Sequence, residues 1–391
     1  MAHRIVFYPV GNGDTSQIIL SNGKRILMDF RHLKCTEDGD RAEINLAAQL
    51  KQELKDEDRD YFDVVAFTHA DKDHIENSTE FFHLEHSSTY QGPGRIKIET
   101  LWVPAAMILE ECSNDQRSSE FVIWRQEARH RLKTGSGIRV FSKPEKLKDW
   151  LADNGIKLED RRHLITDAGQ IAADFSLDRD GVEFFCHSPF IKHVDDGDDL
   201  RNSASLVFNI RFKESGRQFD YLAIGDSKWD VLEDIVKATR AHDNQDRLEW
   251  DLFNIPHHCS AYALAEDKGE KETTPTELVR DILMGGKQNS YLISSSAPIL
   301  DNNAAYEESQ PPHIQAKNCY ETYRRKTGGA KFLVTMEYPN TKKPKPMEFT
   351  VSWTGLSLVT QTVSAVTAIA AAPAPRAGSC GEDAEAGASE I

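Results

Sequence analysis

The sequence predicts an α/β protein in which short strands alternate with helices. Three apolar, strand-like runs end in histidine or aspartate, within residues 63–74, 221–226 and 252–260. Imidazole and carboxylate groups are good ligands for divalent metal ions. Because a sheet edge gathers residues that are distant in sequence, we expect these three strand ends to form one site.

Hydrophobic periodicity and turn residues place the other elements in order along the chain. Strands 17–20 and 25–29 flank a Ser-Asn-Gly-Lys turn that is typical of a hairpin. The expected strands are 4–8, 17–20, 25–29, 64–68, 96–103, 182–187, 204–212, 219–224, 250–255, 290–294, 331–338 and 349–353. The expected helices are 44–56, 118–133, 144–153, 228–239, 276–284 and 313–325.

These elements predict one domain over residues 1–355, with a helical insertion at about 105–165. Residues 356–391 are expected to form a low-complexity, disordered tail, because a segment rich in Ala, Gly, Ser and Glu buries too little apolar surface to fold. Residues 349–375 carry no charge, so a membrane anchor is an alternative for this region. A spanning helix needs about 20 predominantly apolar residues. The Thr, Ser and Gln content favours a final strand and a tail, hence no membrane association.

Composition narrows the class of protein. The net charge of −16 argues against a broadly basic surface that coats nucleic acid, although it permits a nucleic-acid substrate in a local cleft. The six cysteines are scattered without a Cys-x-x-Cys motif, which favours reduced thiols over disulfides or a cysteine zinc site. The N-terminal residues form no signal peptide. We therefore expect a cytoplasmic protein.

The motifs resemble those of the metallo-β-lactamase superfamily. The principal matches are His69-x-Asp71-x-Asp73-His74, Gly225-Asp226 and His257-His258-x-Ser260. The sequence is most similar to the soluble hydrolase domain attached to ComEC-type DNA-uptake channels. That subgroup is matched further, in consistent order over about residues 4–340, by Gly11-Asn12-Gly13-Asp14, Asp29, Asn202-Ser203-Ala204-Ser205, Ser294-Ser295-Ser296 and His313.

The sequence also departs from the superfamily pattern. Asp71 replaces the second histidine of the commoner His-x-His-x-Asp-His motif, as is typical of the ComEC-like branch, and makes the site richer in oxygen. Cys259 replaces the glycine of the usual His-His-Gly-Ser motif. Arg31 replaces the glycine of the usual Asp-x-Gly motif that begins here at Asp29. The membrane helices of the uptake channel are absent, so the sequence does not predict a channel.

The resemblance implies an αββα sandwich, two facing sheets with helices outside, whose edge holds two divalent ions, Zn²⁺ or Mn²⁺. His69 and Asp71 would bind one ion, and Asp73, His74 and His258 would bind the other. Asp226 would bridge the two ions, which together would generate a hydroxide. Asp73 would also orient the attacking water. His257 would contact the scissile phosphate or protonate the leaving group, or would simply support the neighbouring ligand.

Further residues are candidates for supporting or substrate-contacting roles. His187 is a possible additional ligand, with a core or surface histidine as the alternative. Asp14 and Asp29 are expected to support the ligands or to form turns. The remaining candidates for the substrate cleft are Asn202, Ser205, Ser260, Ser296 and His313, for which capping and turn hydrogen bonds are equally good explanations.

By resemblance, the predicted function is a metal-dependent phosphodiesterase or nuclease acting on nucleic acid or nucleotides, single-stranded or small. One alternative is a hydrolase with the same fold that cleaves a lactone, thioester or phosphorylcholine ester. A second alternative, from another class, is a metal-stabilised binding or regulatory module without turnover. The sequence indicates no particular protein partner.

Overall fold

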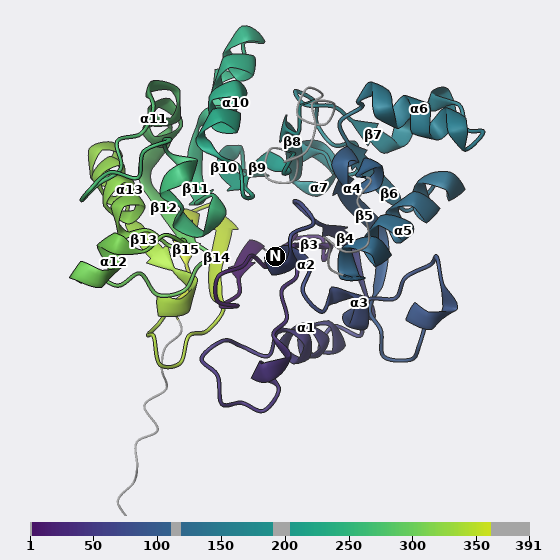
Figure 1. Ribbon diagram of the computed structural model, residues 1–391, viewed down its shortest axis with the longest axis horizontal. Helices are drawn as coiled ribbons and strands as arrows, with labels where there is room; N and C mark the ends of the chain where they lie inside the picture. Colours follow the sequence, from purple (N-terminus) through teal and green to yellow (C-terminus); the bar gives the residue numbers. More distant parts are fainter. Residues whose placement is uncertain (1, 111–118, 191–203, 361–391) are drawn as a thin grey trace, which may run out of the picture. The chain divides into compact units, whose positions relative to one another are not determined.

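A computed structural model describes residues 2–110, 119–190 and 204–360 of the chain. The strands of these residues form two mixed sheets, one of nine strands and one of six. Helices lie beside each sheet, α10, α11 and α13 on one side and α1, α3, α5 and α6 on the other (Figure 1). The predicted αββα sandwich is confirmed.

The nine-stranded sheet has the order β15-β14-β1-β2-β3-β4-β5-β6-β7. Its pairs from β15 to β3 are antiparallel, and those from β3 to β7 are parallel. Its strands are β1 His3–Phe7, β2 Ser16–Ile19, β3 Arg25–Met28, β4 Tyr61–Ala66, β5 Lys97–Pro104, β6 Ile138–Phe141, β7 Ile165–Thr166, β14 Met347–Ser352 and β15 Gly355–Leu358.

The six-stranded sheet has the order β13-β12-β11-β10-β9-β8. Strands β8, β9 and β10 are antiparallel, whereas β10 to β13 run parallel. Its strands are β8 Val182–Ser188, β9 Val207–Glu214, β10 Arg217–Ile224, β11 Trp250–Asn254, β12 Gly286–Ser294 and β13 Lys331–Val334. The parallel part brings the carboxyl ends of β10 and β11 to the same edge.

The helices supply the two outer layers. They are α1 Leu46–Lys55, α2 Lys72–Ile75, α3 Ser78–Phe81, α4 Ala105–Leu109, α5 Ser119–Thr134, α6 Glu145–Asp153, α7 Leu177–Asp180, α10 Trp229–Ala241, α11 Glu277–Met284, α12 Asn303–Glu307 and α13 Ile314–Thr327. Short 3₁₀ turns include η6 Gln245–Leu248, η7 His257–Cys259 and η8 Ala261–Ala263.

Strand alternation divides the apolar residues among three cores. In β4, Val64 and Ala66 face the other sheet, whereas Val65 packs on the outer helical layer. In β10, Tyr221 and Ala223 face inward, and Leu222 packs towards the helices. Both sheets are therefore apolar on both faces. The polar residues that follow the ends of the strands lie at the edge of the sheets.

Two boundaries differ from the expectation. The segment at about 105–165 contains helices α4, α5 and α6, but it also contains β6 and β7, which extend the sheet beside β5. The apolar residues of β6 are all buried, which explains why this stretch pairs instead of forming a separate helical insertion. Strand β15 lies partly within the expected tail, because Leu356 and Leu358 pack against the core between the sheets.

The expected disordered tail, from residue 361 onwards, lies outside the described residues. The helices that the structure describes include none that is long and apolar enough to cross a membrane.

Candidate metal centre

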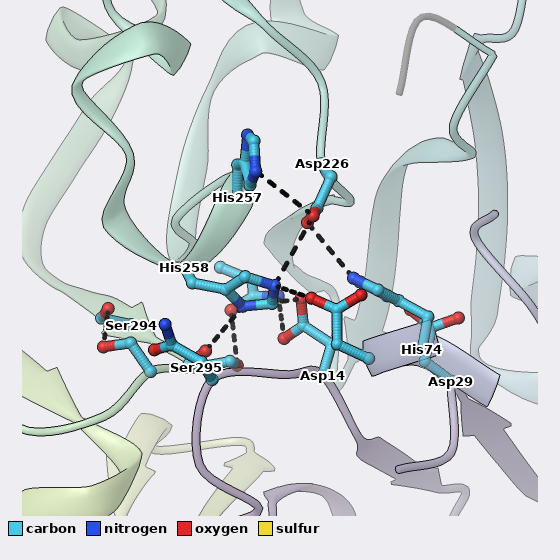
Figure 2. A network of polar contacts seen from close by, with 12 residues as sticks. Asp14, Asp29, His74, Asp226, His257, His258, Ser294 and Ser295 are labelled. Atoms are coloured by element: carbon cyan, nitrogen blue, oxygen red, sulfur yellow. Dashed lines mark hydrogen bonds and ion pairs between the residues drawn. The ribbon is translucent and has the colours of Figure 1, made fainter. Parts of the chain in front are cut away.

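The three predicted strand ends meet at one edge of the two sheets. Residues 69–74 follow β4, Asp226 follows β10, and His257 and His258 follow β11 in η7. A fourth segment joins them, the turn between β1 and β2 that carries Asp14. Figure 2 shows Asp14, His74, Asp226 and His258 pointing towards one another from these separate segments.

The tightest group contains Asp14, His74, Asp226 and His258, all buried, with one ligand atom from each lying within 4.8 Å of the others. Asp226 Oδ1 lies 3.3 Å from His74 Nε2, and Asp226 Oδ2 lies 3.5 Å from His258 Nε2. His258 Nε2 also lies 3.0 Å from Asp73 Oδ2, which places Asp73 at the border of the group. This geometry is suited to a divalent cation held by nitrogen and oxygen atoms.

His69 and Asp71 form a second group of potential ligands beside Asp226. His69 Nε2 is 3.7 Å from Asp71 Oδ2 and 3.8 Å from Asp226 Oδ2. The rings of His69 and His74 are neighbours, with centroids 3.9 Å apart. The two groups of potential ligands therefore share Asp226, whose two carboxylate oxygens face different histidines.

Hydrogen bonds at Nδ1 determine how the three buried imidazoles point. His74 Nδ1 donates to Asp29 Oδ2 at 2.8 Å, and His258 Nδ1 donates to the Ser295 carbonyl at 2.9 Å. The Thr68 hydroxyl donates to Asp29 Oδ2 at 2.7 Å, so its oxygen accepts from His69 Nδ1 at 3.1 Å. With each Nδ1 engaged as a donor, a ring that loses its Nε2 proton would present the Nε2 lone pair to the cluster, as a metal ligand requires.

The pKa values show how strongly this site attracts positive charge. Burial alone would lower the pKa of His74 and of His258. The surrounding carboxylates together outweigh burial, Asp226 and Asp29 at His74 and Asp226, Asp73 and Asp14 at His258, and raise both pKa values well above the ordinary range. Burial would likewise raise the pKa of Asp226, yet His258 and His74 hold it well below its usual value. Protons on imidazoles thus balance the carboxylates here, and a cation would replace those protons.

Unpaired atoms provide an independent test of whether the residues fit a metal ion. His69 Nε2, His74 Nε2 and Asp226 Oδ1 are buried and have no hydrogen-bond partner among the described residues. A buried polar atom without a partner costs about 1–3 kcal/mol. These three atoms lie close together, with His74 Nε2 3.3 Å from Asp226 Oδ1, and a divalent cation in place of the imidazole protons would satisfy them.

His257 occupies a different position from the other histidines. Its Nε2 lies 3.8 Å from Asp226 Oδ2, and its side chain is 23% exposed, compared with 3% for His258. Its Nδ1 finds no hydrogen-bond partner among the described residues, and burial lowers its pKa. In Figure 2 its ring lies above the Asp226 carboxylate, whereas His74 and His258 lie below it. This ring is available to a substrate.

The turn that carries these histidines has an unusual backbone. His257, His258 and Cys259 have φ values of 51°, 50° and 68°, in the left-handed region that residues other than glycine rarely occupy. Cys259, which stands where the motif that this chain resembles has a glycine, therefore adopts a glycine-like conformation. His313 holds the turn, because its backbone N–H donates to the Cys259 carbonyl at 3.0 Å and its Nδ1 accepts from Ala261 N–H at 3.0 Å.

The other predicted residues have varied positions. The Ser260 hydroxyl accepts from Tyr262 N–H at 3.3 Å and caps η8, and Ser296 contacts Ser294 at 2.7 Å. Both serines therefore have local structural bonds. Ser205 is buried beside Gly225, where an added Cβ would lie 3.3 Å from the Ser205 Cβ, a tight contact that favours glycine. Asn202 lies outside the described residues.

His187 does not join the cluster. It alternates with Cys186 on β8, and Cys186 packs between the sheets, so His187 faces the outer helical layer. Its Nε2 donates to the Arg247 carbonyl at 3.0 Å, and its Nδ1 accepts from the Thr239 hydroxyl at 3.3 Å. The proposal of His187 as a ligand is therefore corrected, and the alternative of a core histidine fits the structure.

Two supporting residues were missed from the sequence. Thr68 bonds Asp29 through both its backbone N–H and its hydroxyl, each at 2.7 Å, so it supports His74 through the Asp29 carboxylate and His69 through its own hydroxyl. Asn254 donates to Asp14 at 3.4 Å and accepts from Ser295 at 3.2 Å. Thr68 comes two residues after β4, and Asn254 is the last residue of β11. Polar residues at strand ends beside the ligand motifs are the sequence signal that would have indicated both.

The chain is similar to several solved structures. Neither a protein-family model nor a curated sequence matches the chain. Similar solved structures include the metallo-β-lactamase GOB-18 from Elizabethkingia meningoseptica, which is 14% identical over 71% of this chain and 84% of its own, with a TM-score of 0.30. A diphosphatase of the PhnP family is 10% identical over 90% of this chain and 99% of its own, with a TM-score of 0.30.

A third similar structure is the class B3 di-zinc metallo-β-lactamase LRA-12 from an Alaskan soil metagenome, 14% identical over 66% of this chain and 80% of its own, with a TM-score of 0.27. The fold of the present chain is defined by the sheets and helices described above, and its candidate metal site by the cluster around Asp226.

Proposed function

We propose that this chain is a metal-dependent hydrolase of the metallo-β-lactamase type that cleaves phosphodiester bonds in nucleic acid or nucleotides. The observation that carries the proposal is that the buried atoms His69 Nε2, His74 Nε2 and Asp226 Oδ1, which make no hydrogen bond among the described residues, gather beside the partly exposed His257. The choice of phosphodiester as substrate derives from the resemblance of the motifs to ComEC-type hydrolase domains.

Two divalent ions, Zn²⁺ or Mn²⁺, are proposed as cofactors. His74, His258 and Asp226, with Asp14 or Asp73, would hold one ion, and His69, Asp71 and Asp226 would hold the other. When bound, such ions supply Lewis-acid stabilisation of negative charge on ester oxygens and lower the pKa of water. The carboxylates favour cation binding, whereas an anionic phosphodiester would be repelled by the same carboxylates in the absence of cations.

The protein's own residues have separate tasks in this proposal. Burial would raise the pKa of the Asp73 carboxyl, but His258 and His74 together outweigh burial and hold this pKa below its usual value, so Asp73 remains ionised and can orient the attacking water. The imidazole of His257 is neutral at pH 7 and accessible, so it can donate a hydrogen bond to a phosphoryl oxygen or to the departing oxygen. Asp29 and Thr68 keep His74 and His69 in the orientation that the cations need.

The net charge of −16 favours short substrates. Long duplex DNA is captured mainly through lysines and arginines that neutralise phosphates, and this chain has an excess of acidic residues. We therefore infer that single-stranded oligonucleotides and small nucleotides are the better substrates. Salt should have only a modest effect on their cleavage.

The experiment is a substrate panel on one metal-loaded preparation. It compares a single-stranded oligonucleotide, a dinucleotide, a long duplex, a lactone, a thioester and a phosphorylcholine ester, with His257→Gln as the matched variant. Metal-dependent cleavage of the first two, reduced in the variant, supports the proposal. Rapid hydrolysis of the lactone or thioester with every phosphodiester intact would reject the substrate class. Tight metal binding without any turnover would favour a regulatory module.

A further inference from the structure

Arg31 connects two of the segments that carry candidate metal ligands. Its Nη1 donates to the Val10 carbonyl at 2.8 Å, in the turn that carries Asp14, and its Nε donates to Glu76 at 3.3 Å, directly after α2. The Arg31 side chain is 18% exposed, so both contacts are largely shielded from water. A glycine, which the Asp-x-Gly motif has at this position, could make neither contact.

The backbone around Arg31 belongs to the same connection. The Arg31 N–H donates to the Thr15 hydroxyl at 2.9 Å, and this hydroxyl donates to the Asp14 carbonyl at 2.7 Å. The preceding residue, Phe30, donates its N–H to the His74 carbonyl at 2.9 Å. One short segment after β3 is therefore bonded both to the turn that carries Asp14 and to the helix that carries His74.

Gly13 allows the turn to approach this segment closely. A Cβ added to Gly13 would lie 2.7 Å from the Asp73 carbonyl oxygen and would overlap the Arg31 Cδ. The turn therefore packs directly between the side chain of Arg31 and the backbone of Asp73. Because Asp14 is the next residue, its position depends on this packing.

Other residues attach the same turn to the six-stranded sheet. Asn12 Oδ1 accepts from a backbone N–H after β12 at 2.8 Å. The Asp14 carboxylate receives hydrogen bonds from Asn254, at 3.4 Å, and from Ser295. These bonds hold Asp14 towards the six-stranded sheet, whereas the compact cluster also contains His74, which follows a strand of the nine-stranded sheet. The Arg31 side chain supplies an attachment on that second side.

We propose that Arg31 is a positioning residue that holds Asp14 as a ligand of the ion bound by His74 and His258. The proposal rests on the proposed metal centre and deepens it, because it chooses Asp14 over Asp73 as the carboxylate that completes this ion's ligands. Without the Arg31 side chain, the turn keeps its bonds to the six-stranded sheet and Asp14 moves away from His74. Loss of a group that positions a ligand typically lowers metal affinity by about 10–100-fold.

The test measures Mn²⁺ binding to the full chain after a chelator has removed its metal, with free Mn²⁺ followed by EPR, so no activity is required. Arg31→Met keeps the apolar stem and removes the donors, and Glu76 keeps Lys72 as a partner at 3.3 Å. Arg59→Met is the matched control. Arg59 is 14% exposed and also bonds a carboxylate and a turn carbonyl, that of Gly23 at 2.6 Å, but this turn lies at the opposite end of β2 and β3.

We expect the affinity for one of two Mn²⁺ ions to fall about 10–100-fold in Arg31→Met and to remain unchanged in Arg59→Met. Thermal unfolding establishes that both variants are folded. Arg31→Lys is a milder variant, because its single ammonium group keeps the charge but cannot reach both partners of the guanidinium at once. It should show a smaller loss of the same ion.

A double variant shows whether Arg31 acts through Asp14. Asp14→Asn should itself weaken one ion, and Asp14→Asn combined with Arg31→Met should lose no more affinity than Asp14→Asn alone. Unchanged Mn²⁺ affinity in Arg31→Met, equal losses in Arg31→Met and Arg59→Met, or additive losses in the double variant would overturn the proposal and leave the metal centre standing. No Mn²⁺ binding by the wild-type chain would overturn both.

Discussion

Asp29 and His74 are 45 residues apart in the sequence, and the Asp29 carboxylate accepts a hydrogen bond of 2.8 Å from His74 Nδ1. The same carboxylate oxygen accepts from the Thr68 hydroxyl at 2.7 Å. One buried aspartate at the end of β3 therefore determines the direction of His74 directly and that of His69 through Thr68. The metal centre depends on this carboxylate although it contributes no atom to the compact cluster.

The first prediction tests this relationship. Asp29→Asn should lower the affinity for Zn²⁺ or Mn²⁺ by about 10–100-fold, the usual effect of losing a carboxylate that orients a ligand histidine. Asn is the suitable replacement because Asp29 has a φ of 56°, a conformation that Asn tolerates. Metal titration gives the affinity, and thermal unfolding is the control for the fold. An unchanged affinity would show that the orientation of His74 does not depend on Asp29.

The second prediction separates the roles of Asp226 and His258. Asp226 faces both groups of ligand atoms, so Asp226→Asn should weaken two metal sites together, whereas His258→Ala should mainly weaken one. Hydrolysis should fall by about 10²–10³-fold in both variants, comparable to the loss of one charge-stabilising group. Metal stoichiometry under limiting metal distinguishes the variants. Wild-type activity in Asp226→Asn would reject the central position given to this residue.

The fold was largely predictable because its signals are local. Apolar periodicity located helices such as α1 and α10, and the Ser-Asn-Gly-Lys turn located the β2–β3 hairpin. The strands β6 and β15 were missed as members of the sheet for different reasons. Strand β6 follows a long helix in a segment dominated by helical patterns, and β15 lies in an uncharged stretch that resembles the tail composition.

The site was predictable where ligand-type residues end strands, and less so elsewhere. His69, His74, Asp226 and His258 come together as the motif order suggested. The placement of Asp14 inside the compact cluster depends on how the β1–β2 turn approaches β11, which is a tertiary relationship. The outward direction of His187 depends on strand register, since one residue of shift would have turned it towards the other sheet.

The third prediction concerns pH and stability. The pKa of His187 is lowered from 6.5 to about 4 by burial, so between those pH values the unfolded chain binds a proton that the folded chain does not. The free energy of unfolding should therefore fall as pH decreases from 6.5 towards 4. His187 alone should account for roughly 3 kcal/mol of this decrease. His187→Gln retains a donor for Arg247 without titrating. Its unfolding free energy should vary less steeply with pH; an identical slope in denaturant titrations would contradict the assignment.

The fourth prediction concerns the end of the folded chain. A chain that ends at residue 360 should retain the melting temperature and activity of the full chain, because the composition of residues 361–391 lacks the apolar content to pack. A chain that ends at residue 353 loses β15, with Leu356 and Leu358, and should lose roughly 2–4 kcal/mol of unfolding free energy. Equal destabilisation by both truncations would show that residues beyond 360 contribute to the fold.

The central claim is that the cluster around Asp226 is a divalent metal centre that hydrolyses phosphodiesters. The most direct measurement is the rate of bis-p-nitrophenyl phosphate hydrolysis by protein stripped with a chelator and then titrated with Mn²⁺ or Zn²⁺, with Asp226→Asn as the blank. The account predicts negligible hydrolysis by the stripped protein and a rate that rises to a plateau at two ions per chain. Hydrolysis that persists without metal, or a fully loaded wild-type protein no faster than Asp226→Asn, would contradict it.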